Sequence, residues 1–180
     1  VCSAIAGVLI FILPCILIIL LVKLTSAGPV FHWSSRIGRY SYPFLMPKFR
    51  SMKFDTPIIA TDKLTNPDDY ITFVGKFLRK TSLDEIPQLI SVLQGHMSIV
   101  GPRPALEDQK YLIAKRRELG IDSLRPGITG WAQIHGRDEI PVEVKIRLDH
   151  EYLQKASFSF DAKIIVLTII AVVSSKNISH

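Results

Sequence analysis

The chain has 180 residues, of which 48% are hydrophobic and 21% charged. This composition predicts one sizeable core and excludes an intrinsically disordered chain. The net charge of +6 favours an anionic partner, whether nucleic acid, acidic phospholipid or a phosphorylated substrate, without choosing among them. The two cysteines, Cys2 and Cys15, would lie about 20 Å apart on a continuous helix, too far for a disulfide. We therefore expect a reduced protein that faces the cytoplasm.

The first predicted element is an apolar helix, because no charged residue occurs from Val1 to Val22. Such a helix would be about 33 Å long, close to the roughly 30 Å hydrocarbon core of a bilayer. Pro14 near its middle predicts a kink, since proline removes a backbone hydrogen bond. Two topologies remain open: a kinked span, or a re-entrant helix that bends at Pro14 and returns to the same face. The residues alone favour the span.

From Val30 to Lys53, five basic residues are interleaved with six aromatic ones. This mixture favours a surface that meets phosphates or membrane headgroups. The alternative is a solvated edge strand with aromatic packing. If the segment is extended, Lys48 and Arg50 project on one face and Phe49 on the other.

The segment from Thr81 to Gly95 predicts an amphipathic helix, because apolar residues recur in it with helical spacing. These residues are Leu83, Ile86, Leu89, Ile90 and Leu93. The polar start of this helix has two interpretations. In the first, Ser82 and Glu85 form a capping box. In the second, Asp84 is the N-cap, which places Pro87 within the first turn, where its missing N–H costs little.

The adjacent carboxylates Asp84 and Glu85 are candidate functional groups. As N-cap, Asp84 would lie beside free backbone N–H groups, which favour an ionised carboxylate and can hold a phosphate. Two adjacent carboxylates can also bind Mg²⁺. Downstream, the stiff turn Gly101-Pro102-Arg103-Pro104 presents Arg103, whose guanidinium suits a phosphate. The alternative is an ordinary surface arginine on a turn.

Residues 105–119 predict a further helix that Gly120 terminates, with the charges of residues 115–117 on a solvated face. Residues 125–137 contain three glycines and two arginines and predict a functional loop rather than a regular element.

For the last two segments, the sequence pattern allows more than one structure. The alternating pattern of 141–148 slightly favours a strand, although Pro141 at the first position of a helix is the alternative. The uncharged run 164–173 is too short to span a bilayer and predicts core or interfacial packing.

Several motifs of the chain resemble those of a known family. The motifs are KFRSM at 48–52, LRKTSLDEIPQL at 78–89, MSIVGPRP at 97–104, RPGITGWAQIHGR at 125–137 and LDHEY at 148–152. In sequence and order they closely resemble the bacterial sugar transferases, the monotopic polyprenyl-phosphate phosphoglycosyl transferases. The resemblance covers nearly the whole chain.

The resemblance implies a membrane reaction. A sugar-1-phosphate would pass from a UDP-sugar, carrying an N-acetylated amino sugar or a hexose, to polyprenyl (undecaprenyl) phosphate, with release of UMP. This reaction is the first membrane step of bacterial glycoconjugate assembly, for glycoprotein glycans, O-antigen, capsule or exopolysaccharide. Downstream glycosyltransferases are then the expected partners, and nucleic acid is not.

The resemblance also implies roles for individual residues. Asp84 would be the nucleophile of an Asp-Glu dyad with Glu85, forming a covalent aspartyl phospho-sugar, and both carboxylates would hold Mg²⁺. The residues that we expect to bind the substrate are Lys48, Arg50, Arg79, Arg103, Gln133, Arg137 and Arg147.

The implied fold is α+β and mostly helical. Residues 1–24 would form a re-entrant membrane helix kinked at Pro14, which reverses the preference for a span. Residues 25–180 would form a small cytoplasmic catalytic domain with interfacial amphipathic helices, at the cytoplasmic face of the bacterial inner membrane. The resemblance also makes the segment after Pro141 helical.

Several positions depart from the family pattern. Leu13 precedes the bend proline, where serine is common, and Met46-Pro47 before Lys48 is atypical. His96 stands where aspartate is frequent, and His135 stands where asparagine is usual.

A competing hypothesis makes the chain a non-catalytic scaffold anchored at the membrane. Such a scaffold would bind acidic lipid or a partner transferase. It predicts lipid binding without release of UMP from any UDP-sugar.

Overall fold

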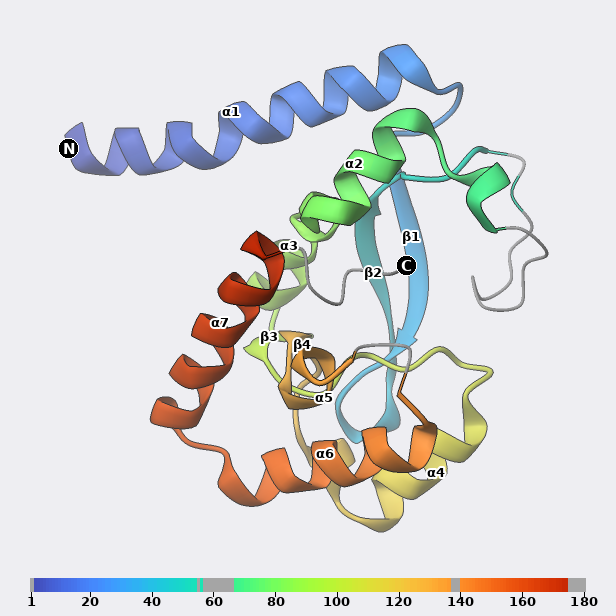
Figure 1. The fold of residues 1–180 in the computed structure, drawn as a ribbon, viewed down its shortest axis with the longest axis vertical. Helices are drawn as coiled ribbons and strands as arrows, with labels where there is room; N and C mark the ends of the chain where they lie inside the picture. The colour runs from blue at the N-terminus through green and yellow to red at the C-terminus, as the bar shows by residue number, and fades with distance from the viewer. Residues whose placement is uncertain (1, 55, 57–66, 137–139, 175–180) are drawn as a thin grey trace. The chain divides into compact units, whose positions relative to one another are not determined.

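The computed structural model describes residues 2–54, 56, 67–136 and 140–174. It mixes helices with two two-stranded sheets, as the sequence predicted for an α+β fold (Figure 1). The chain divides into two compact units, one made of Val1–His32 and Lys48–Ile86 and the other of Trp33–Pro47 and Pro87–His180.

The first unit is built on two helices that pack against each other, α1 (Cys2–Thr25) and α2 (Phe73–Thr81). Thr72 caps α2, since its Oγ1 accepts a hydrogen bond of 2.9 Å from the N–H of Gly75. Two short 3₁₀ helices, η3 (Pro67–Tyr70) and η4 (Leu83–Glu85), precede and follow α2. The buried core of this unit consists of Ile18, Val22, Phe49, Val74 and Leu78.

Helix α1 carries the predicted membrane segment. Its backbone stays helical through Pro14 (Figure 1). Among the residues that the structure describes, no helix has the length and apolar character needed to cross a bilayer. The re-entrant geometry of residues 1–24 therefore stays a prediction.

Strands β1 (Phe31–Ile37) and β2 (Pro43–Phe49) pair with each other and are joined through the 3₁₀ helix η1 (Arg39–Ser41). Tyr40 and Ser41 take left-handed backbone conformations in this connection, with φ of 54° and 62°. Phe31 stacks on Phe49 with 5.4 Å between ring centroids. The segment from 30 to 53 therefore includes two paired strands with aromatic packing, as one of the two interpretations expected.

The second unit contains the short parallel strands β3 (Ser98–Val100) and β4 (Gly127–Thr129), with Ser98 opposite Gly127 and Val100 opposite Thr129. The other elements, shown in Figure 1, are α3 (Gln88–Leu93), α4 (Lys110–Glu118), η5 (Ile121–Ser123), α5 (Trp131–Ile134), α6 (Val142–Lys155) and α7 (Phe158–Val173). Two clusters of buried residues form its core, one around Ala105, Leu112, Ile121 and Ile146, the other around Val100, Tyr152 and Ile164.

The predicted single amphipathic helix within residues 81–95 is wrong. Ser82 is left-handed, with φ of 56°, and ends α2, after which the N–H of Glu85 donates to the carbonyl of Ser82 in a 3₁₀ turn. Because Pro87 has no N–H to donate, the helical pattern starts again after it, at Gln88. Neither Ser82 nor Asp84 is the N-cap of an α-helix, so both N-cap interpretations fail.

Other predicted elements agree more closely. Helix α4 starts at Lys110, five residues later than expected, and Gly120 follows it with φ of 71°. The segment after Pro141 is helical, so the alternation within it did not indicate a strand. Residues 125–137 include β4 and α5, which corrects the prediction of an irregular loop.

Candidate active site

Asp84 lies in η4, directly after the turn that ends α2. Its apolar neighbours Leu83 and Ile86 pack against the core of the first unit, and η4 contacts α2. This anchoring leaves the Asp84 side chain only 5% exposed. A buried carboxylate needs a compensating partner or a functional reason.

Burial and the neighbouring cations have opposite effects on the pKa of Asp84. Burial raises the pKa of its carboxyl above the usual range, and the charge of Glu85 adds to this effect. The positive charges of Lys48 and Arg79 lower the same pKa. Within the part of the chain that the structure describes, Oδ1 of Asp84 has no hydrogen-bond partner. The carboxylate is thus poorly solvated while two cations favour its ionised form.

The residues beside Asp84 form a polar cluster within the first unit. Nζ of Lys48, at the end of β2, lies 2.9 Å from Oε1 of Glu85 in a partly buried ion pair. Nε of Arg79, in the last turn of α2, donates a hydrogen bond of 2.9 Å to Oγ of Ser51. Lys48, Arg79, Asp84 and Glu85 are therefore brought together, as their proposed roles require. Ser51 was not predicted, although it lies within the KFRSM motif.

Arg50 is placed differently from Lys48. Its Nη2 donates to the carbonyl oxygen and the hydroxyl of Ser26, at 2.8 and 3.2 Å, in the loop that follows α1. The side chain is buried, and burial lowers the pKa of the guanidinium. Gly28 in this loop has a backbone φ of 104°, which residues with a side chain rarely adopt, and a Cβ there would also collide with Nη1 of Arg50. In this structure Arg50 anchors the loop after α1.

Three more of the predicted substrate-binding residues belong to the second unit. Arg103 is half-buried in the turn after β3, and Arg147 is exposed on α6. Gln133 donates from Nε2 to the carbonyl of Ile128 at 2.8 Å. Arg137 lies outside the described residues.

A buried pair in the second unit was missed. Arg116, on α4, is 8% exposed, and Asp149, on α6, is 1% exposed. Nε and Nη2 of Arg116 donate to Oδ2 of Asp149 at 3.0 and 2.6 Å. The prediction of a solvated face at residues 115–117 is therefore wrong for Arg116. Its position four residues after the buried Leu112, on the same helix face, was the available signal.

The carboxylates can be compared with what Mg²⁺ requires. Asp84 and Glu85 are adjacent, and Asp84 keeps an oxygen without a hydrogen bond in the described chain. Throughout the described ranges, no group of three or more His, Cys, Asp or Glu residues could hold a metal ion. This donor set fits an ion held by one or two carboxylates and completed by substrate phosphates and water, which is a common mode for Mg²⁺.

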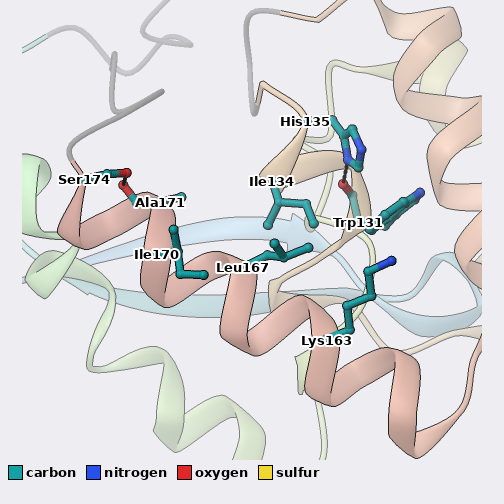
Figure 2. A pocket seen from close by; sticks show the side chains of 8 residues that line it. All are labelled: Trp131, Ile134, His135, Lys163, Leu167, Ile170, Ala171 and Ser174. Carbon is teal, nitrogen blue, oxygen red and sulfur yellow. Dashed lines mark hydrogen bonds between the residues drawn. The ribbon is translucent and has the colours of Figure 1, made fainter.

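A hollow of about 380 Å³ lies between α5 and α7 in the second unit. Figure 2 shows Lys163 and His135 on either side of Trp131. The rest of the wall is apolar except for Ser174. Nζ of Lys163 lies 5.6 Å from the centroid of the Trp131 ring. None of the predicted site residues lines this hollow, and we assign the candidate site to Asp84 and its neighbours.

Comparisons with known proteins show which family the chain resembles. A family model described as bacterial sugar transferase matches residues 1–175. The chain is 43% identical, over 84% of its length, to a UDP-glucose:undecaprenyl-phosphate glucose-1-phosphate transferase of Escherichia coli (strain K12), and it covers 34% of that protein. It is 40% identical to the uncharacterized sugar transferase EpsL of Bacillus subtilis (strain 168), over 95% of this chain and 86% of that one. It is 39% identical to the exopolysaccharide production protein ExoY of Rhizobium meliloti (strain 1021), over 89% of this chain and 77% of that one.

Proposed function

Because the chain belongs to the bacterial sugar transferase family, we propose that it transfers a sugar-1-phosphate from a UDP-sugar to polyprenyl phosphate and releases UMP. Relatives from three organisms carry the name UDP-glucose:undecaprenyl-phosphate glucose-1-phosphate transferase. The chain spans only about a third of the length of these three relatives, between 34 and 37%. The observation that carries the proposal is the buried carboxylate of Asp84. Its Oδ1 has no hydrogen-bond partner among the described residues, and the cations Lys48 and Arg79 lie nearby.

In the first half of the proposed reaction, Asp84 is the nucleophile. An oxygen of its ionised carboxylate forms a bond to the β-phosphorus of the UDP-sugar, and the bond from that phosphorus to the bridging oxygen breaks. UMP leaves with the electron pair of the broken bond. Asp84 then carries the phospho-sugar as an acyl phosphate.

In the second half, an oxygen of polyprenyl phosphate attacks the same phosphorus. The bond to Asp84 breaks, and its carboxylate is regenerated. Dividing the transfer into two displacements replaces one difficult step with two easier ones. The product, a polyprenyl diphosphate sugar, is the substrate that downstream glycosyltransferases would extend.

The neighbours of Asp84 would bind and orient the diphosphate. Lys48 and Arg79 supply positive charge near the carboxylate, and charge-assisted hydrogen bonds to phosphate are strong. Glu85 holds the ammonium of Lys48 at 2.9 Å. We assign Mg²⁺ to the carboxylates of Asp84 and Glu85, where it would neutralise charge on the diphosphate and improve UMP as a leaving group.

Release of UMP tests the proposed function. Membranes that contain the protein, Mg²⁺ and undecaprenyl phosphate should release UMP from at least one sugar in a panel that starts with UDP-glucose and includes N-acetylated amino sugars. Without the acceptor, release should stop near one UMP per protein, because Asp84 stays occupied. Lipid binding without UMP release from any UDP-sugar would support the scaffold hypothesis instead.

We also propose that the chain lies at the cytoplasmic face of the bacterial inner membrane. On α1, large apolar side chains are exposed along the described part of the helix, and on α7 they form an outer face. They are Leu13, Ile16, Leu17, Leu20, Leu24, Val166, Ile169 and Ile170. Apolar side chains that face outward on helices, on a chain of net charge +6, suit a membrane surface with anionic lipid.

The topology of α1 can be tested by cysteine labelling. Single cysteines are placed on each side of Pro14 in a chain that carries Cys2→Ser and Cys15→Ser. If the helix is re-entrant, an impermeant reagent applied to one face of the membrane should label both flanks. Labelling of the two flanks from opposite faces would mean a span.

A further inference from the structure

Ser51, in the segment that follows β2, forms hydrogen bonds with both ends of α2. At the start of the helix, the N–H of Thr72 donates to the carbonyl of Ser51 at 3.0 Å, and Oγ1 of Thr72 donates to the same carbonyl at 3.3 Å. At the end of the helix, Nε of Arg79 donates to Oγ of Ser51 at 2.9 Å. All three residues belong to the first unit. Ser51 is only 7% exposed, so the protein itself surrounds its hydroxyl.

Gly75 allows α2 to lie directly against the backbone of Ser51. A Cβ at Gly75 would overlap the carbonyl oxygen of Ser51. Residues four positions apart lie on the same face of a helix, so Arg79 is on the face that Gly75 turns toward Ser51. The bond from Nε of Arg79 then holds the guanidinium itself, which is the group that carries the charge.

The guanidinium that Ser51 holds acts on the candidate nucleophile. The positive charge of Arg79 lowers the pKa of the Asp84 carboxyl, against the effect of burial, so the two groups lie within electrostatic range of each other. A serine hydroxyl is a neutral acceptor, so it orients the guanidinium without cancelling its charge. The Arg79 side chain is only partly buried, which leaves part of it open to a ligand.

We propose that Ser51 is a positioning residue that holds the guanidinium of Arg79 beside Asp84, where it binds a phosphate of the UDP-sugar during the attack. This inference rests on the proposed function, in which Asp84 is the nucleophile and Arg79 binds the diphosphate. Ser51 acts on the reaction only through Arg79. Its effect on the rate should therefore depend entirely on the presence of that arginine.

The first half-reaction alone tests this dependence. The purified full chain in detergent receives Mg²⁺ and a UDP-sugar that the wild type uses, without polyprenyl phosphate. The amplitude of the UMP burst counts the molecules with a working Asp84, and the burst rate reports how well the transition state is stabilised. Arg79→Ala should lower the burst rate by about a hundredfold, and Ser51→Ala should lower it by about fivefold or more. Both variants should keep the wild-type amplitude.

The double variant measures the coupling between the two residues. Adding Ser51→Ala to Arg79→Ala should cause no further loss of burst rate, because the guanidinium that Ser51 orients is already absent. Losses that multiply in the double variant would overturn the inference, since Ser51 would then act independently of Arg79.

Two control variants separate positioning from the general packing of α2. Ser51→Thr keeps a hydroxyl at this position and should keep a burst rate close to that of the wild type. Thr72→Ala removes the N-cap of α2 and one bond to the Ser51 carbonyl, but it leaves the Ser51 hydroxyl with Arg79. It should lower the stability of the protein and leave the burst rate unchanged. If Ser51→Thr does not fold, the double variant decides the question.

The remaining outcomes distinguish the inference from the function that it rests on. The inference is overturned if Ser51→Ala reacts at the wild-type rate, if it loses amplitude rather than rate, or if Thr72→Ala is slowed as much as Ser51→Ala. If Arg79→Ala reacts at the wild-type rate while the wild type releases one UMP per protein, the inference fails and the proposed function stands. If the wild type releases no UMP, with or without polyprenyl phosphate, the proposed function itself is removed.

Discussion

Asp84→Asn is expected to lower kcat by about a thousandfold or more while the protein stays folded, because an amide cannot form the aspartyl phospho-sugar. The matched control is Asp69→Asn, which changes an exposed aspartate of the same unit and should retain activity. UMP release from the UDP-sugar measures both. Turnover by Asp84→Asn at the wild-type rate would remove Asp84 as the nucleophile.

The same substitution should make the protein more stable near neutral pH. Burial raises the pKa of Asp84 in the folded protein, so the folded state binds the proton more tightly than the unfolded state does. The contribution of Asp84 to the free energy of unfolding is therefore fully present below the ordinary carboxyl pKa of about 3.9. It is lost as the pH rises through the raised pKa of the folded state. Asparagine is neutral at every pH and avoids the cost of burying the charge.

Thermal unfolding across pH measures this effect. Asp84→Asn should unfold a few degrees above the wild type at pH 7 to 8, and the difference should shrink as the pH falls toward about 4. Asp69→Asn should show no such trend. If Asp84→Asn instead has a lower thermal unfolding midpoint than the wild type at every pH, the surroundings of Asp84 must stabilise its ionised carboxylate.

The sequence indicated which residues to examine better than it indicated what surrounds them. Asp84 and Glu85 were recognisable because two adjacent carboxylates lie within the LRKTSLDEIPQL motif that resembles the family. Lys48 was a candidate from its motif, but the ion pair with Glu85 joins residues 37 positions apart. Such a contact depends on how β2 and η4 pack in three dimensions, which no local periodicity encodes.

Other features were missed because local patterns competed with tertiary contacts. The apolar spacing of residues 83–93 predicted one helix, whereas the left-handed Ser82 and the missing N–H of Pro87 divide the segment. Arg116 stands among basic residues typical of a solvated face, and only the position of Asp149 on α6 explains its burial. Arg50 is taken up by the loop after α1, a role that its motif did not suggest.

Gly101→Ala should be among the most destabilising substitutions outside the hydrophobic core, costing about 3 kcal/mol or more. A Cβ at this position would overlap the carbonyl oxygen of Arg125 and lie 2.9 Å from the N of Gly127. Both are backbone atoms, which cannot rotate away as a side chain would. The parallel pair β3 and β4 is only three residues long in each strand, so it depends on this close approach.

Gly95→Ala is the matched control for Gly101→Ala. A Cβ at Gly95 would meet no atom within 4 Å, and the substitution is strained only by a backbone φ of 79°, which costs about 1 kcal/mol. Unfolding in urea should therefore give Gly101→Ala a clearly lower free energy of unfolding than Gly95→Ala. Equal stability of the two variants would show that the turn can move away from β4 without cost.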